Sequence, residues 1–506
     1  MRTVKGANSK VVVVGAGLAG LSAALHLAGR GRHVTVLERA DGPGGRAGHL
    51  DLRGFQLDTG PTVLTMPDIV RDTFDAVGAD MTERLPLVRL DPAYTAHFAD
   101  GGNLAVHSDL DMMCEAVREF AGPAEVDRYR QLRAWLTRLY AVEYDRFIAA
   151  NMDSPLEMVT KDLARLVALG GFRRLDPKIG SFLQDERLKR VFSFQALYAG
   201  ESPMHALALY AVISYMDTVG GVYFPRGGMA ALPLALASAA ADAGVDFRYG
   251  KQVTALDRRG DRVHAVLTDT GERVACDAVV LTTEAPESYR LLGRTPRRIT
   301  RLRAAPSALV LHAGVTGNRP EVGHHTISFG DAWKSTFDEL ISQGRLMSDP
   351  SLLITRPTAT DPGLAPPGCQ LLSILAPVPN LDVAPLDWRQ ESGPYVESLL
   401  DIVRERLLPG FEPEVSHVIS PADWAERGMV AGTPFSYAHS FGQTGPFRPG
   451  NLPRGVDNVV LAGGATVPGV GVPTVLISGR LAADRITGTR SRPARTTVDL
   501  SARGAR

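Results

Sequence analysis

The chain has 506 residues, of which 44% are hydrophobic and 22% are charged, and its 55 basic and 55 acidic side chains give a formal net charge of zero. This composition is typical of a globular protein with about three domains, and it excludes disordered, fibrous and multi-span membrane proteins. The balanced charge argues against a nucleic-acid-binding protein that recognises phosphates through a basic field. The three cysteines are widely spaced, so the sequence predicts neither a disulfide framework nor a zinc site.

The first predicted elements are a buried strand and a buried helix near the N-terminus. No charged residue occurs between Val11 and Gly29, so a hydropathy window would suggest a membrane span or a signal peptide. The segment begins instead with four consecutive valines, is interrupted by glycines and shows helical spacing after Gly20. We therefore expect a strand that is covered on both faces, followed by a helix that packs on it.

The turn between these two elements carries a dinucleotide-binding fingerprint, G-x-G-x-x-G, formed by Gly15, Gly17 and Gly20. In this pattern Gly15 allows the tight turn, Gly17 lets the backbone approach a pyrophosphate, and Gly20 lets the helix pack closely on the strand. The amides at the helix N-terminus then face the phosphates.

A second strand is expected at 33–37, and it ends at Glu38, which lies 23 residues after Gly15. A carboxylate at this spacing accepts hydrogen bonds from ribose hydroxyls, and it would repel a 2′-phosphate. After Arg39 the chain continues to Gly45 and Arg46, where small residues allow a close backbone approach and the guanidinium offers forked donors. An ordinary surface turn with a solvated arginine is the alternative interpretation of this second motif.

Strand patterns also occur at 244–256, 262–267, 273–276 and 278–283, and a last strand–turn–helix pattern runs from 458 to 486. The turn of this last unit contains Gly463, Gly464 and Thr466 and leads to Val472 at the start of the helix. Such a turn presents backbone amides to a bound group.

Taken together, these motifs resemble those of the glutathione-reductase-like flavoproteins, in the branch shared by amine oxidases and carotenoid desaturases. The C-terminal spacing G-x-T-x-P-G-x-G-x-P, between Gly464 and Pro473, resembles that of the bacterial phytoene desaturase family, and the resemblance extends from Val11 to about Ile486. It also includes the segments 57–67 and 220–229. One departure is Val467, where many family members carry a histidine.

The resemblance implies an FAD-dependent enzyme that inserts double bonds into a C40 isoprenoid, most simply phytoene, toward lycopene. It implies that FAD is bound without a covalent link and that oxygen or a quinone, rather than NAD(P), accepts the electrons. It also implies a cytoplasmic protein held peripherally at the inner face of the cell membrane. The expected cofactor-binding residues are Gly15, Gly17, Gly20, Glu38, Arg39, Gly45, Arg46, Val253, Gly463, Gly464, Thr466 and Val472. Val253 is included because a valine at this position meets the adenine in such flavoproteins.

Five other functions are considered as alternatives. A later-stage carotenoid desaturase, a ketolase and a carotenoid isomerase would share all these motifs. A flavin-free carrier of prenylated proteins has a related fold, but Glu38, Arg46 and the C-terminal glycines argue against it. An amine oxidase is disfavoured because Gly463, Gly464 and Ala465 include no carboxylate beside the flavin-binding turn.

The expected fold is α/β, with a glutathione-reductase-like Rossmann FAD domain and a mixed α+β substrate domain. The FAD domain is assembled from 1–100, 220–300 and 425–490. The substrate domain, which faces the membrane, comprises 101–219 and 301–424, and a disordered tail is expected at 491–506.

The substrate-domain segments suggest a hydrophobic tunnel rather than a catalytic triad. Apolar residues between 115 and 150 have the spacing of a core helix, and residues 206–216 are apolar enough to line a tunnel. A helical face at 156–167 lies within a basic segment, 155–190, which favours a membrane surface and a solvated core helix about equally. His324 and His325 are interpreted as loop residues, no metal site is expected, and no catalytic base is selected from the many carboxylates.

Overall fold

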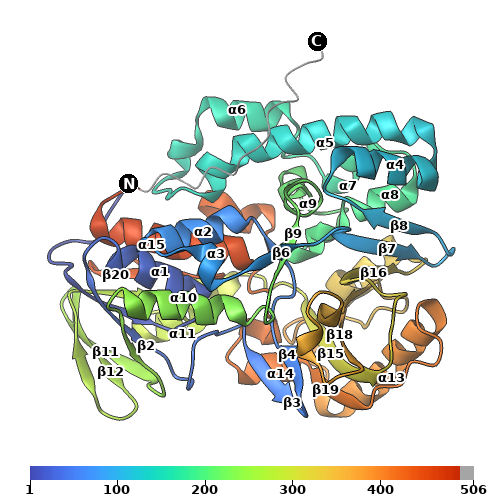
Figure 1. The fold of residues 1–506 in the computed structure, drawn as a ribbon. Coiled ribbons are helices and arrows are strands. Elements are labelled where there is room, and N and C mark those ends of the chain that lie inside the picture. Colours follow the sequence, from blue (N-terminus) through green and yellow to red (C-terminus); the bar gives the residue numbers. More distant parts are fainter. Residues whose placement is uncertain (491–506) are drawn as a thin grey trace.

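The computed structural model describes residues 1–490, and its first building block is a five-stranded parallel sheet with the order β10-β2-β1-β14-β20 (Figure 1). Each neighbouring pair in this sheet is parallel. The strands come from three distant parts of the chain: β1 (Lys10–Val14), β2 (His33–Leu37), β10 (Asp246–Arg248), β14 (Ala278–Leu281) and β20 (Val459–Leu461). The α/β fold with a Rossmann-like sheet is thereby confirmed.

The apolar N-terminal segment forms the centre of this layer. The valines of β1 are almost completely buried, and the helix that follows, α1 (Leu18–Ala28), is buried on nearly all sides. It packs against α15 (Val472–Thr487) and α10 (Ala231–Asp242). A Cβ atom at Gly479 of α15 would lie 2.3 Å from the Ala19 carbonyl oxygen, so a glycine is required where the two helices cross. The expectation of a buried strand and helix is correct.

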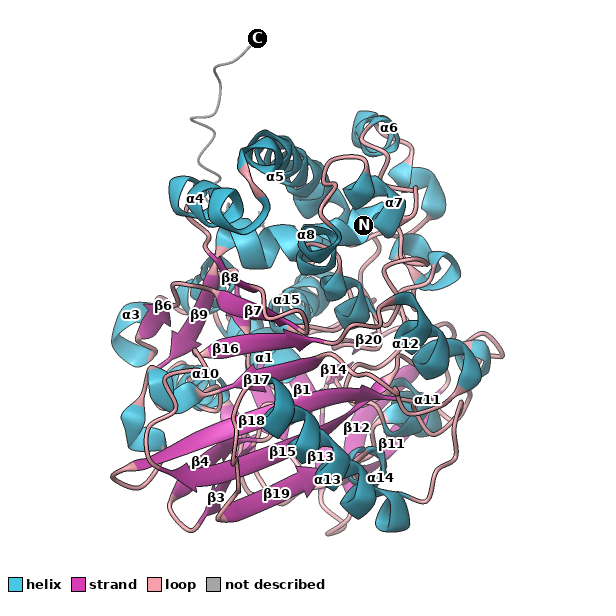
Figure 2. Cartoon of the chain, turned by 90° about the vertical axis from the view of Figure 1, so that its right-hand side faces the viewer, coloured by secondary structure: helices cyan, strands magenta, loops and turns pink. Residues whose placement is uncertain are grey.

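The second building block is a seven-stranded sheet with the order β19-β15-β18-β17-β16-β7-β8, whose strands lie side by side in Figure 2. Its strands are β7 (Tyr94–Phe98), β8 (Asn103–Val106), β15 (Ser307–Thr316), β16 (His325–Phe329), β17 (Leu352–Thr355), β18 (Cys369–Val378) and β19 (Val415–Ile419). The long helix α13 (Trp388–Arg406) covers one face, where it forms an aliphatic core with β15 and β18. The expected flavin-domain piece 1–100 thus includes one strand, β7, that pairs in this other sheet.

Smaller sheets connect the two blocks. An antiparallel meander is formed by β11 (Val253–Arg259), β12 (Arg262–Thr268) and β13 (Arg273–Ala275), as the strand patterns predicted. The strand β9 (Val222–Pro225) pairs with β5 (Leu64–Thr65) and β6 (Leu87–Arg89). A hairpin is formed by β3 (His49–Leu52) and β4 (Phe55–Asp58).

A helical layer lies beyond β7 and the edge strand β8 (Figure 1). It contains α4 (Leu110–Ala121), α5 (Pro123–Glu143), α6 (Lys161–Ala168), α7 (Leu175–Gly180), α8 (Glu186–Val191) and α9 (Ala211–Tyr215). The apolar stripe of α5 is buried in the main core, so its interpretation as a core helix is correct. Tyr140 of α5 stacks on Tyr215 of α9 at a centroid distance of 4.3 Å, which joins the two helices directly above the cavity described below.

Two local expectations are wrong. The helical face expected at 156–167 is divided, because the Thr160 hydroxyl caps a new helix at Leu163 N and the residues Pro155–Met158 form only a 3₁₀ turn. His325 is not a loop residue, since it begins β16, whereas His324 does lie in the preceding loop, and both are buried. Their Nδ1 atoms meet Thr360 and Thr355 hydroxyls, and this local pairing replaces solvent.

No helix within residues 1–490 is both long and apolar enough to cross a membrane. The expected disordered tail, 491–506, lies outside the described residues.

Candidate functional site

A cavity of about 1640 Å³ opens where β1, β2, β14 and β20 end. Ligands bind at this edge in open parallel sheets, because the strand ends and the helix N-termini face it. The volume exceeds the roughly 300–1,000 Å³ of a pocket for one small ligand. Glycines and charged groups line the end near the strands, whereas the far end is almost entirely apolar. The cavity therefore offers space for a dinucleotide and for a second, apolar molecule.

The first glycine loop leaves an open cradle at the N-terminus of α1. A Cβ atom at Gly17 would meet only the Cα of Gly45, at 3.8 Å, so the space beside this backbone is free for a ligand. Gly20 allows close packing within the turn, since a Cβ atom added at this position would lie 2.0 Å from the Gly15 carbonyl oxygen. Gly15 has a φ of 105°, which a residue with a side chain rarely adopts.

Glu38 is held rigidly beside this loop. Its two carboxylate oxygens accept hydrogen bonds from Ala16 N at 2.7 Å and Ala40 N at 2.9 Å, and 9% of the residue remains exposed. The side chain lines the cavity, so its remaining acceptor positions are available to hydroxyl groups there. Arg39 lines the same wall and donates a hydrogen bond to the Arg427 carbonyl oxygen.

The second motif and the C-terminal turn meet at Arg46. Its guanidinium forms an ion pair with Glu284, and a Cβ atom at Gly464 would lie 3.2 Å from Arg46 Nη1. Segments more than 400 residues apart in the sequence thus form one wall. The arginine is fixed in place by its carboxylate partner rather than free in solvent, which contradicts the surface-turn interpretation.

The C-terminal turn is supported from behind by Arg448. This guanidinium is almost completely buried and donates to the carbonyl oxygens of Gly464, at 2.6 Å, and Thr466, at 3.1 Å. Burial lowers the pKa of Arg448 to about 10, which leaves it charged at neutral pH. The Thr466 hydroxyl donates to the Pro449 carbonyl oxygen at 2.7 Å. The Gly463 amide donates to Ser478 Oγ at 3.0 Å, so two buried side chains, Arg448 and Ser478, fix this turn beside the cavity.

Ten of the twelve expected cofactor-binding residues line this cavity: Gly15, Gly17, Glu38, Arg39, Gly45, Arg46, Val253, Gly463, Gly464 and Val472. Gly20 and Thr466 do not line it, and their contacts shape the two glycine turns instead. Val472 is the first residue of α15, whose 16 residues direct the helix N-terminus toward the site.

The apolar end of the cavity is built by the helical layer and by the seven-stranded sheet. The segment 206–216 contributes much of its wall, together with residues from α6, β17 and β18. The apolar lining includes Met152, Met158, Leu163, Leu166, Phe172, Leu197, Leu207, Leu209, Val212, Ile213, Met216, Leu353 and Leu375.

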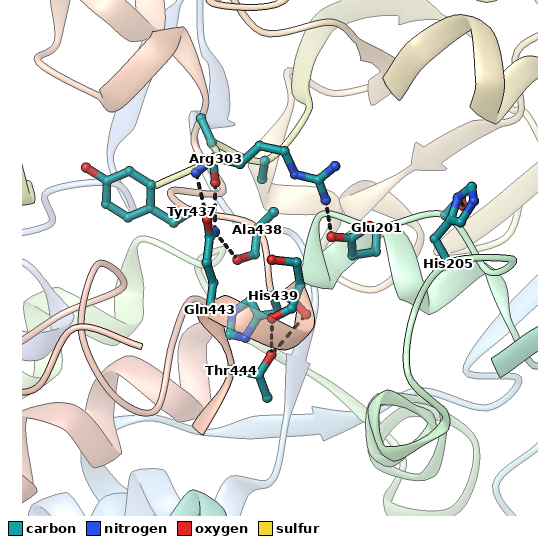
Figure 3. Close-up of polar contacts among 12 residues, drawn as sticks. Glu201, His205, Arg303, Tyr437, Ala438, His439, Gln443 and Thr444 are labelled. Carbon is teal, nitrogen blue, oxygen red and sulfur yellow. Dashed lines mark hydrogen bonds and ion pairs between the residues drawn. The ribbon is translucent and has the colours of Figure 1, made fainter. Parts of the chain in front are cut away.

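A loop at 437–447 separates the two ends and was not singled out from the sequence. Figure 3 shows Gln443 bridging Arg303 and the Ala438 carbonyl, and the Arg303 side chain paired with Glu201. His439 lies in this loop, and its Nδ1 is 3.2 Å from the Tyr210 hydroxyl. A Cβ atom at Gly469 would lie 2.3 Å from the His439 ring, so the imidazole packs directly on the C-terminal turn. Burial lowers the pKa of His439, so the ring is neutral.

Two acidic residues of the cavity wall have no cationic partner. Burial raises the pKa of Asp217 to about 7 and raises that of Glu143 well above its usual range. The other acidic residues of the wall are engaged: Glu38 with backbone amides, Glu284 with Arg46 and Glu287 with Arg290. None of the described residues forms a group suited to a metal ion.

These features fit FAD. The Gly17 cradle accepts a pyrophosphate without a steric obstacle, Glu38 offers carboxylate oxygens to a ribose, and the turn at Gly463 and Gly464 lines the same cavity. Arg46 adds a fixed cation between them. The remaining apolar volume lies beyond the C-terminal turn, where a flavin ring would end.

Sequence comparison identifies the family. The model of the flavin-containing amine oxidoreductases matches residues 18–487. The chain belongs to this family. It is 63% identical to a phytoene dehydrogenase of Streptomyces griseus, with 97% of each chain covered. It is 36% identical to a zeta-carotene-forming phytoene desaturase of Myxococcus xanthus, over 94% of this chain and 93% of that protein. The resemblance to bacterial phytoene desaturases is thereby confirmed.

Solved structures of low sequence identity share the fold. Putrescine oxidase aligns with a TM-score of 0.63 at 16% identity, over 95% of this chain and 99% of that chain. An oxidoreductase from Methanosarcina mazei aligns with a TM-score of 0.60 at 19% identity, over 93% and 98% of the two chains. These structures show the fold alone, and the expectation of an FAD-dependent oxidoreductase is confirmed by the family and by the curated relatives.

Proposed function

We propose that this flavoenzyme desaturates phytoene toward lycopene. The observation that carries the proposal is the continuity between the glycine-lined end of the cavity and a long apolar end that offers no cation and only two unpaired acidic residues. A hydrocarbon has no polar group to anchor, so its recognition requires this kind of lining. The names of the relatives in Streptomyces griseus and Myxococcus xanthus support the same substrate.

In this reaction the residues that line the apolar end position the substrate and do not form a covalent bond with it. FAD supplies the acceptor for two electrons and one proton as hydride. The apolar wall holds the polyene along the cavity and excludes water, while the C-terminal turn would hold the flavin ring. The N-terminus of α15 favours negative charge on the ring edge that faces it.

We assign the twelve expected residues to FAD in two roles. The ten residues that line the cavity contact the cofactor. Gly20 and Thr466 shape the N-terminal and the C-terminal glycine turn, respectively. We retain the discontinuous FAD domain and the inserted substrate domain, and we propose oxygen or a quinone as the electron acceptor. The described residues contain one such glycine fingerprint after a strand, at β1, which supports a single nucleotide site.

We further propose that the cavity mouth docks on an anionic membrane surface at the cytoplasmic side. Six large apolar residues are exposed near the mouth, and we call them the apolar rim: Leu156, Val159, Val167, Phe172, Phe441 and Phe447. Leu156 and Val159 are 79% and 74% exposed. Lys161 and Arg173 lie exposed in the same segment, where each cation contributes about 1 kcal/mol near anionic lipid. A hydrophobic substrate can then enter from the bilayer.

Product analysis tests the substrate. Cells that make phytoene should accumulate coloured carotenoids when they express this protein, and chromatography of the extract should show loss of phytoene. Unchanged phytoene alongside folded, flavin-loaded protein would contradict the proposal. Conversion of a supplied later carotenoid instead would favour a late-stage desaturase, ketolase or isomerase.

Vesicle sedimentation tests the docking surface. The double variant Leu156→Asp, Val159→Asp should bind anionic vesicles at least tenfold more weakly than the wild type. In the wild type both apolar side chains move from water into the lipid surface on docking, and aspartate side chains cannot do so favourably. Leu234 is exposed on α10, outside the cavity lining, so Leu234→Asp is a matched control that should leave binding unchanged. Equal vesicle binding by the wild type and the double variant would contradict this surface.

A further inference from the structure

The proposed reaction leaves one proton without an acceptor, and the cavity wall offers few candidates. Five carboxylates line it, and three of these are engaged by backbone amides or arginines: Glu38, Glu284 and Glu287. Among residues 1–490, only Asp217 and Glu143 line the cavity as acidic side chains without a cationic partner. The choice of a base is thus reduced to two side chains on neighbouring helical segments.

Asp217 lies close to the wall on which the flavin would rest. It belongs to a π-helical segment, Met216–Gly220, that packs against β5 (Leu64–Thr65). The chain leading into β5 packs in turn on the second motif, since a Cβ atom at Gly60 would lie 1.8 Å from the Arg46 carbonyl oxygen. Thr65 and the residues 60–63 line the same cavity. This chain of direct packing connects Asp217 to Arg46 through one short segment.

The groups around Asp217 leave its carboxylate reactive. Tyr94 from β7 and Tyr198 from the 3₁₀ helix Phe194–Ala199 lie near enough for the Asp217 charge to raise the pKa of both phenols. The Gln195 amide forms a side-chain hydrogen bond that limits the rise in the pKa of Asp217, and burial still brings that pKa to about 7. From α5, Arg133 donates to the Thr218 carbonyl oxygen at 3.3 Å rather than to the carboxylate.

Glu143 is the weaker candidate. Its Oε1 atom is buried without a hydrogen-bond partner among the described residues, and burial raises the pKa of its carboxyl well above the usual range. Burial therefore favours the protonated form of this carboxyl, which has no free site for another proton. Its ionised form would face Tyr210 and the neutral His439 beside the C-terminal turn.

We propose that Asp217 is the catalytic base that accepts the second hydrogen of each desaturation as a proton. One hydrogen leaves the hydrocarbon with its bonding electrons and passes to the flavin. The proton on the adjacent carbon passes to an Asp217 carboxylate oxygen, and the electron pair of that C–H bond becomes the second bond of the alkene. The neutral carboxyl then releases its proton to water when the cavity opens, and the electron acceptor reoxidises the flavin. This inference rests on the proposed desaturation.

The kinetic test compares three variants in vesicles that contain phytoene. Asp217→Asn should reduce turnover at least 100-fold with unchanged flavin content, since positioned bases contribute about 10²–10⁴-fold. Wild-type turnover should rise with pH through about 7, and Asp217→Glu should recover part of the loss with a shifted pH profile. Asp58→Asn is the matched control, because Asp58 is half-buried, burial raises its pKa to about 6, and it lies outside the cavity lining. It should keep the wild-type pH profile of turnover.

A second readout needs neither flavin nor substrate. In flavin-free protein the pKa of Asp217 is raised by burial, so its carboxyl is protonated in both the folded and the unfolded state below about pH 4 and does not lower the free energy of unfolding there. As the pH rises to about 7, Asp217 lowers the free energy of unfolding progressively. Asp217→Asn should therefore unfold at a higher temperature than the wild type at pH 7.5, with a smaller difference at pH 5. No difference between the two pH values would contradict an uncompensated buried carboxylate at this position.

The outcomes separate the two proposals. If the wild type converts phytoene but Asp217→Asn does so equally well, or if Glu143→Gln causes the larger loss, Asp217 is not the base and the desaturase assignment stands. A wild-type protein that binds FAD but leaves phytoene unchanged would overturn the proposed function and this inference together.

Discussion

The two ends of the cavity differ in how the chain specifies them. The end near the parallel sheet is built from short sequence motifs. Its main groups are glycine backbone, the Glu38 carboxylate and the Arg46 guanidinium. The apolar end is built from single side chains contributed by helices and strands scattered between residues 152 and 375. The difference shows that a charged ligand such as a dinucleotide requires backbone and side-chain groups at fixed local positions. A hydrocarbon requires only an apolar cavity of suitable shape that excludes water.

The largest effect is expected from blocking the motif-built end. Gly17→Val places a side chain in the open cradle, where the nearest atom to a Cβ is 3.8 Å away. Gly17 has a φ of −74°, so valine is compatible with its backbone and the chain should still fold. We expect the purified variant to be colourless, with FAD affinity reduced at least 100-fold in a fluorescence titration. Full flavin content in folded protein would show that the pyrophosphate lies elsewhere.

Blocking the apolar end should affect only the second ligand. Ile213 of α9 is half-buried and lines the cavity, so Ile213→Trp narrows it without touching the glycine turns. We expect more than tenfold loss of desaturation with a wild-type flavin spectrum, measured by product chromatography. The matched variant Ile213→Val keeps the space open and should retain most activity. Loss of flavin from the tryptophan variant would indicate that the two ends are not independent.

A smaller effect is expected at the junction of the motifs. Arg46→Ala removes the guanidinium beside Gly464 and leaves Glu284 without its partner. Because a charge-assisted hydrogen bond contributes about 1.5–3 kcal/mol, FAD should bind roughly 10–100-fold more weakly. Arg46→Lys keeps the positive charge but lacks the forked donors. Its FAD affinity should lie between those of the wild type and Arg46→Ala in the same titration. Equal affinity in the wild type and the alanine variant would exclude a direct role.

The sequence predicted the motif-built end well because its signals are local. The spacing of Gly15, Gly17 and Gly20 between a valine strand and a helix describes one turn, and no distant contact is needed to read it. Arg448, His439 and Asp217 carry no such spacing, and their roles arise only when the chain folds back on itself. The same reason explains the error at His325, which pairs with the distant Thr355 of β17.

The smallest effect concerns packing alone. Gly20→Ala would force a Cβ atom to within 2.0 Å of the Gly15 carbonyl oxygen, so α1 must shift from β1. We expect a loss of about 1–3 kcal/mol in the free energy of unfolding, comparable to other overpacked positions. Urea denaturation of flavin-free protein measures it, with Ala24→Gly in the same helix as a reference for propensity alone. Unchanged stability would mean that α1 packs less tightly than described.

The central claim is that the two ends hold a flavin and a hydrocarbon in one cavity, and an anaerobic single-turnover experiment tests it most directly. Purified FAD-loaded protein is mixed with phytoene in anionic vesicles without oxygen or quinone, and the flavin absorbance and the carotenoid products are followed together. The account predicts loss of the yellow colour with one new double bond formed per flavin reduced. A flavin that stays oxidised with phytoene but is reduced by putrescine would contradict it.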